Sequence, residues 1–181
     1  LARIIENYAQ VVEEKDEETG KKKYKQIFPR YHQLTAVESL LADVKKNGVG
    51  NRYLIQHSAG SGKSNSIAWL AHQLTNLEDT QGNLLVDSVI VVTDRVVLDK
   101  QIRDTIRQFA QTRNIIAWAE HSGDLTKAIT DGKRIIVTTI EKFPYIVPQI
   151  GAEHKDNRFA IIIDEAHSGQ SGRNSAQMNL A

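Results

Sequence analysis

An eight-residue segment from His57 to Ser64 has the residue types and spacing of a phosphate-binding loop. It reads H-S-A-G-S-G-K-S, and it departs from the general pattern G-x-x-x-x-G-K-[ST] at the first position, where His57 replaces glycine. Glycines permit backbone conformations that a Cβ would block, so amide N–H groups can surround a phosphate. We expect nucleotide binding by Ser58, Ala59, Gly60, Ser61, Gly62, Lys63 and Ser64, with Lys63 on the β and γ phosphates and the Ser64 hydroxyl on Mg²⁺.

Two adjacent carboxylates, Asp164 and Glu165, follow the apolar run Ile161-Ile162-Ile163. Ligands of open α/β sheets bind at the carboxyl ends of strands, where this pair and the phosphate loop could meet. Asp164 would then hold Mg²⁺ and Glu165 would polarise the attacking water. Acidic residues often follow strands without a catalytic role, and the phosphate loop upstream favours the catalytic interpretation. His167 is either a residue that couples hydrolysis to movement or a plain surface histidine.

Apolar strands alternate with amphipathic helices along the chain, which predicts an α/β fold. A helix over 31–46 carries Leu34, Val37 and Leu41 at helical spacing, and it precedes the short apolar strand Tyr53-Leu54-Ile55. The strands are short, β-branched and continuous, as in parallel sheets with helices on both faces, so we predict a three-layer fold with right-handed crossovers. After the loop and its helix we expect strands at 86–93, 115–118, 134–138 and 159–164, helices at 95–110 and 123–131, and a short helix from Ile140 that ends before Pro144.

The first 27 residues form an extension ahead of the predicted α/β domain, which covers residues 28–181. Residues 1–12 are mildly amphipathic and predict a helix or a strand. From Glu13 to Lys25 acidic residues precede Gly20 and basic residues follow it. This segment is either a hairpin that brings opposite charges together or a solvated linker.

The composition is that of an ordinary globular domain and excludes several classes of site. The chain has 181 residues, of which 40% are hydrophobic, and its net charge is +1. This balance does not decide for or against nucleic acid, which would need a local basic patch. The chain has no cysteine, so disulfides and thiolate metal sites are excluded. No apolar run reaches the roughly 18 residues of a membrane span, and we expect no membrane contact and a cytoplasmic location.

Further motifs resemble those of superfamily 2 helicases and translocases. Arg30-Tyr31-His32-Gln33 looks like an adenine-reading R-x-x-Q motif, and D-E-A-H at 164–167 is similar to motif II. Segments 92–102 and 137–143 look like motifs Ia and Ib. Within the superfamily, phrases such as T-D-R-V-V-L-D-K-Q-I and I-I-I-D-E-A-H-S-G-Q-S-G resemble the motor (R) subunit of type I restriction enzymes.

This resemblance implies the first RecA-like lobe of a motor that uses ATP and Mg²⁺ to translocate double-stranded DNA. It implies adenine contact by Arg30 and Gln33 and DNA-backbone contacts by Arg95, Thr139 and Lys142. It also implies methylation and specificity subunits as partners, and a nuclease upstream. We expect motif III and the second RecA-like lobe beyond Ala181, so that residues 1–181 alone would be inactive or weakly active. Rival interpretations are another DNA or RNA helicase, and a nucleotide-switched binding module.

Overall fold

Four short parallel strands, β3 (Ser88–Thr93), β4 (Ile116–Trp118), β5 (Ile135–Thr139) and β6 (Phe159–Ile163), form the central sheet. The computed structural model describes residues 2–15, 20–58, 60–93, 96–109, 115–119, 121–141 and 156–164. The strand order is β4-β5-β3-β6, so β3 is paired on both edges. In the parallel register Val91 aligns with Val137 of β5 and Ile162 of β6.

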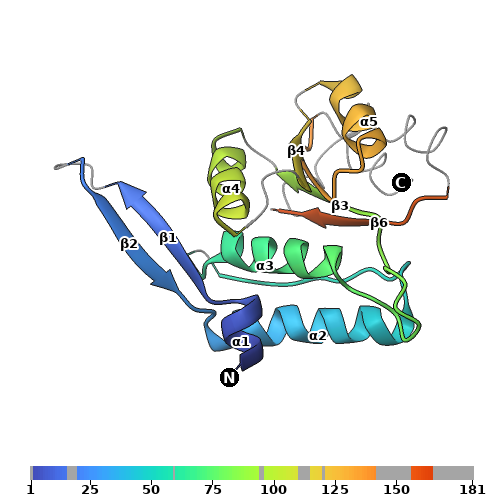
Figure 1. Ribbon diagram of the computed structural model, residues 1–181, viewed down its shortest axis with the longest axis horizontal. Helices are drawn as coiled ribbons and strands as arrows, with labels where there is room; N and C mark the ends of the chain where they lie inside the picture. Colours follow the sequence, from blue (N-terminus) through green and yellow to red (C-terminus); the bar gives the residue numbers. More distant parts are fainter. Residues whose placement is uncertain are drawn as a thin grey trace.

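Helices cover both faces of this sheet (Figure 1). Helix α3 (Lys63–Thr75) and helix α4 (Val96–Phe109) lie on one face, and α5 (Ser122–Thr130) lies on the other. Helix α2 (Tyr31–Asn47) packs on the outer side of α3. The predicted three-layer α/β fold with a parallel sheet is therefore confirmed.

The layering follows from strand β3, whose six residues are all buried. Successive side chains of a strand point to opposite faces. Val89 and Val91 accordingly belong to the core cluster shared with α2, α3 and α4, whereas Ile90 and Val92 belong to a cluster on the opposite side. A strand covered on both faces needs apolar residues at every position, which is the continuous pattern that the sequence shows.

The N-terminal extension consists of helix α1 (Ala2–Asn7) and an antiparallel hairpin of β1 (Gln10–Lys15) and β2 (Lys22–Ile27) that projects from the body (Figure 1). Opposite charges meet across it, because the Lys22 ammonium of β2 lies 2.9 Å from the Glu13 carboxylate of β1. The structure thus selects the hairpin over the linker.

The extension is also attached to the core through Tyr8, which is buried in the main cluster. The indole N–H of Trp69 in α3 donates to the Tyr8 carbonyl at 2.9 Å, and the two rings lie 5.7 Å apart. A domain boundary at residue 28 stays a prediction.

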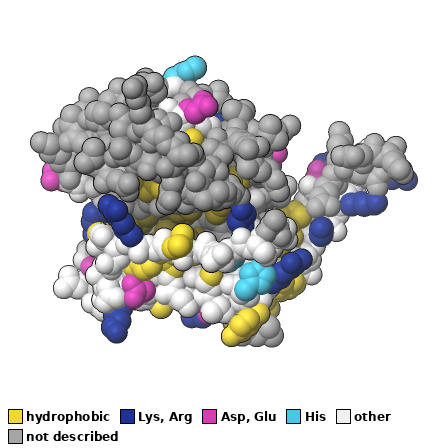
Figure 2. All heavy atoms as spheres, turned by 180° about the vertical axis from the view of Figure 1, so that it is seen from behind, with side chains coloured by type: hydrophobic (Ala, Val, Ile, Leu, Met, Phe, Trp, Pro, Cys, Tyr) yellow, Lys and Arg dark blue, Asp and Glu magenta, His cyan; other side chains and the backbone are white. Residues whose placement is uncertain are grey.

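One predicted element is wrong: residues 53–55 do not form a strand. The Tyr53 hydroxyl donates to the Asp43 carboxylate of α2 at 2.7 Å, so this segment is tied to a helix and not to the sheet. Leu54 is 87% exposed. A strand of three residues would form few ladder hydrogen bonds with a neighbour. Among the described strands β6 pairs only with β3, so residues 53–55 do not pair with it. The view from behind shows several hydrophobic side chains at the molecular surface (Figure 2).

The other predicted helices and strands agree with the structure to within a few residues at their ends. The short helix expected to start at Ile140 and end before Pro144 lies partly outside the described residues, which stop at 141 and resume at 156. Within the described ranges, none of the helices combines the length and apolar composition required to cross a bilayer.

The packing of α3 against α4 predicts a pH-dependent stability. Burial lowers the pKa of His72, and its hydrogen bond to the Ile106 carbonyl at 3.1 Å offsets this only in part. Below about pH 6.5 the unfolded chain therefore takes up a proton that the folded chain does not, and the free energy of unfolding falls, by no more than about 1.4 kcal/mol per pH unit.

Thermal unfolding between pH 7.5 and 5.5 tests this expectation. A His72→Gln variant, which keeps an N–H donor and cannot titrate, should lose less stability on acidification than the wild type. The exposed residue His121 provides the control, because His121→Gln should follow the wild-type curve. Identical pH dependence in wild type and His72→Gln would contradict the assignment.

Candidate functional site

The phosphate loop enters helix α3 through two glycines in the left-handed conformation. Gly60 has φ +72° and Gly62 has φ +87°, and Gly62 is the N-cap of α3. Within the loop the Ser61 amide donates to the Ser58 carbonyl at 3.2 Å. Lys63 and Ser64 then occupy the first turn of the helix, at its positive end. The predicted glycine-permitted turn into a helix is therefore present.

Ser61 is a buried polar residue whose hydroxyl suits a phosphate. The residue is 8% exposed, and its Oγ has no hydrogen-bond partner among the described residues. Buried polar atoms in native proteins are nearly always hydrogen-bonded, so such a group needs an explanation. A phosphate oxygen bound in the loop would accept a hydrogen bond from the Ser61 hydroxyl and so satisfy it.

The first turn of α2 lies directly against the phosphate loop. The Gln33 amide nitrogen donates to the Gly62 carbonyl at 2.9 Å, while its oxygen accepts from the Arg30 backbone N–H at 2.8 Å. The preceding residue, His32, places Nε2 at 3.3 Å from the Ser61 carbonyl. Because a carbonyl only accepts, Nε2 carries the proton in this contact. Two consecutive residues of α2 thus bind two consecutive carbonyls of the loop.

These bonds bear on the adenine contact expected of Gln33. A glutamine side chain has two donor hydrogens and two acceptor positions, and here one of each is engaged. One donor and one acceptor remain, enough for an adenine edge. The residue is however only 3% exposed, so Gln33 would have to become accessible before adenine could bind. The adenine role of Gln33 and of the exposed Arg30 stays a prediction.

His57, at the position where the pattern has glycine, contacts α2 through its ring. The rings of His57 and His32 meet edge to face, with centroids 5.2 Å apart and an interplanar angle of 79°. Burial lowers the pKa of His57, with smaller contributions from His32 and Lys63. The His57 side chain is therefore neutral near pH 7 and contributes shape, not charge, to the loop.

The carboxyl ends of three strands bring polar residues together at one edge of the sheet. Thr93 of β3 is aligned with Thr139 of β5, and the Asp164 amide donates to the Val92 carbonyl at 2.9 Å. Asp164 directly follows β6 and is 8% exposed. Thr139, a predicted DNA contact, is 5% exposed, and it would have to become accessible to reach a DNA phosphate. That role stays a prediction.

This edge and the phosphate loop lie on the same side of the molecule. In Figure 1 the arrowheads of β3 and β6 point to the left, and α3 begins at its left end. The described residues hold no group of three or more His, Asp or Glu side chains suited to a metal. Mg²⁺ is usually held by one or two carboxylates together with substrate phosphates, and the predicted oxygen donors Asp164 and Ser64 fit that mode.

Five of the predicted site residues lie outside the described part of the chain: Ala59, Arg95, Lys142, Glu165 and His167. Their roles rest on the sequence alone. Sequence reasoning, in turn, missed His32 as a loop contact. Its position inside the Arg30-x-x-Gln33 motif was the one available hint, since that motif was already expected to lie near the nucleotide.

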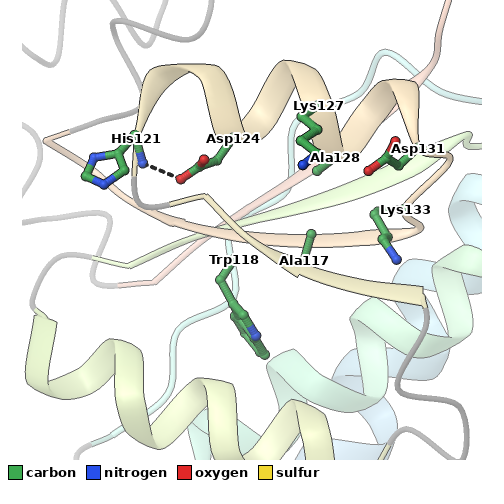
Figure 3. Close-up of a pocket in the computed structure, with 8 residues that line it drawn as sticks. All are labelled: Ala117, Trp118, His121, Asp124, Lys127, Ala128, Asp131 and Lys133. Atoms are coloured by element: carbon green, nitrogen blue, oxygen red, sulfur yellow. Dashed lines mark hydrogen bonds between the residues drawn. The ribbon is translucent and has the colours of Figure 1, made fainter.

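A separate pocket beside α5 and β4 is not the nucleotide site. It lies on the sheet face opposite α3, and its lining residues are Ala117, Trp118, His121, Asp124, Lys127, Ala128, Asp131 and Lys133 (Figure 3). None of them belongs to the predicted nucleotide set. The Asp124 carboxylate accepts the His121 backbone N–H at 2.7 Å and so caps α5. Trp118 points towards α4, where Arg103 and Arg107 stack on its ring at 5.1 and 4.7 Å.

A comparison with protein-family models finds one described as SWI2/SNF2 ATPase, which matches residues 32–181. The match includes His32, Gln33, the whole phosphate loop and Asp164. A search of curated proteins found no match.

The contact between Gly62 and Gln33 predicts that Gly62→Ala weakens nucleotide binding. A Cβ at position 62 would lie 2.6 Å from the Gln33 amide nitrogen, in addition to the left-handed backbone cost of about 1–2 kcal/mol. We expect ATP affinity, measured by calorimetry, to fall about tenfold or more, since about 1.4 kcal/mol is a factor of ten.

Gly132→Ala is the matched control for this variant. Gly132 has φ +69° and open space around its Cβ position, so it incurs the backbone cost alone and should keep wild-type ATP affinity. Wild-type ATP affinity in Gly62→Ala would show that the loop does not bind nucleotide in this conformation.

Proposed function

This chain belongs to the SWI2/SNF2 ATPase family, and we propose that it is the first RecA-like lobe of an ATP-driven double-stranded DNA translocase. The family supports an ATP-driven motor domain in general. The proposal is supported by a glycine-based phosphate loop at the start of α3 and by Asp164, which directly follows β6. Sites of this kind in α/β folds bind ligands at the carboxyl edge of the sheet.

In the proposed reaction the loop residues bind and orient the triphosphate. Backbone N–H groups and the Ser61 hydroxyl would donate to phosphate oxygens, and Lys63 would neutralise charge on the β and γ phosphates. Ser64 and Asp164 would hold Mg²⁺, which supplies further positive charge beside the phosphates. Glu165 would orient the attacking water. Positioning and electrostatic stabilisation are the main contributions a protein makes to phosphoryl transfer.

We further propose that the chain is part of the R subunit of a type I restriction enzyme. The support is the sequence resemblance around residues 92–102 and 161–172. In that role a second lobe would close on the nucleotide, methylation and specificity subunits would be partners, and Arg95, Thr139 and Lys142 would contact the DNA backbone. Such a protein would act in the cytoplasm. A strand-separating DNA or RNA helicase is the rival interpretation, and gene neighbours that encode methylation subunits would decide between the two.

Lys63→Ala in the full-length protein tests the motor function. We expect loss of ATP hydrolysis and of DNA translocation in a triplex-displacement assay, because the ammonium serves phosphates and not the core. Thermal unfolding should stay within a few degrees of the wild type. Lys45→Ala, an exposed lysine near the end of α2, should behave as wild type in both assays. Undiminished triplex displacement by Lys63→Ala would refute the proposal.

Glu165→Gln separates nucleotide binding from chemistry. The substitution removes the group expected to orient water and leaves the phosphate loop untouched. ATP affinity should therefore remain within about threefold of wild type while turnover falls by about 10² or more, the scale of a general-base contribution. A variant that no longer binds ATP would count against the assigned role.

A further inference from the structure

His32 connects two points of the phosphate loop that are four residues apart. Its Nε2 lies 3.3 Å from the Ser61 carbonyl, and its ring packs edge to face against His57. His32 is itself exposed, so the contact is not a by-product of core packing. His57 occupies the position of the first glycine in the general pattern, where no ring would be available to make this contact.

The hydrogen bond to Ser61 sets the direction of a phosphate-facing amide. A trans peptide is planar, and its C=O and N–H point in opposite directions. A Ser61 carbonyl held towards α2 therefore directs the Gly62 N–H away from α2. In a phosphate-binding loop the backbone N–H groups must converge on the anion, so a peptide free to flip would lose one donor.

The neighbouring peptide does not depend on α2 in the same way. The Gly62 carbonyl accepts from the backbone amides of Asn65 and Ser66 at 3.1 and 3.3 Å, as the first acceptor of helix α3. That peptide is fixed by the helix even without Gln33. The Ser61 carbonyl lies one residue before the helix, and it is His32 that supplies its hydrogen bond.

We propose that His32 is a positioning residue for nucleotide phosphates: with His57 as its support, it holds the Ser61–Gly62 peptide so that the Gly62 N–H faces the phosphate. The inference rests on the proposed ATP site. The ligand class is a nucleoside di- or triphosphate, and the role belongs to the donor at Nε2 and not to the charge of the imidazole.

The test compares two replacements of His32 in the full-length protein. His32→Leu removes the donor and keeps bulk, whereas His32→Gln places an amide N–H at a similar reach. Calorimetric titration with Mg-ATP should show binding weakened roughly threefold to tenfold in His32→Leu, as expected for one hydrogen bond, and restored to within about twofold in His32→Gln. Melting temperatures of all variants should agree, because His32 is exposed. His121→Leu is the control, because His121 is an exposed histidine at the start of α5.

A double-mutant cycle with His57→Ala tests whether His57 supports His32 in this role. If His57 acts through His32, then His57→Ala should weaken ATP binding in the wild type and have little further effect in His32→Leu. Additive losses would overturn the coupling.

Two failures are distinguishable in this design. If Lys63→Ala loses ATP binding but His32→Leu binds ATP as the wild type does, only the role of His32 is overturned. If the wild type does not bind ATP, or if Lys63→Ala binds it equally well, the proposed ATP site itself is overturned. Failure of His32→Gln to rescue, with an unchanged melting temperature, overturns the hydrogen-bond mechanism.

Discussion

The arrangement of the molecule depends on the parallel pairing of β3 with a neighbour on each edge. A parallel ladder aligns the carboxyl ends of its strands, so Thr93, Thr139 and Asp164 reach the same edge of the sheet in register. Parallel strands require crossover connections, and here the crossovers supply α4 and α5. The backbone of Asp164 is therefore held at this edge by its hydrogen bond to the Val92 carbonyl.

The phosphate loop is fixed differently, by contacts between segments that are distant in the sequence. Gly62 begins α3 in a left-handed conformation, and side chains from the first turn of α2 bind the loop from outside. The loop is thus held between two helices, of which α3 packs on the sheet and α2 packs on α3. Nucleotide binding at the proposed site would therefore depend on the α2–α3 contact in addition to the loop residues.

The sequence predicted most of the elements because their patterns are local. Strands β3 and β5 are continuous β-branched runs, and α2 carries apolar residues at helical spacing, so each could be read from a short window. The charge order around Gly20 permitted a hairpin, and the Glu13–Lys22 pair now shows it. The same reading failed for Tyr53–Ile55, because strand formation needs a partner. Here Tyr53 is bound to Asp43 of α2, which no local pattern indicates. The contacts of His32 and Gln33 with the loop span 29 residues and were likewise beyond a local reading.

The central claim is that the phosphate loop and the end of β6 form one nucleotide–metal site. Electron paramagnetic resonance with Mn²⁺ in place of Mg²⁺ tests it most directly. Ser64→Ala and Asp164→Asn should each weaken the binding of Mn²⁺ in the presence of ATP and alter its spectrum, while ATP remains bound. Spectra and Mn²⁺ affinities that match the wild type in Asp164→Asn would contradict the claim, because the strand end would then lie apart from the nucleotide.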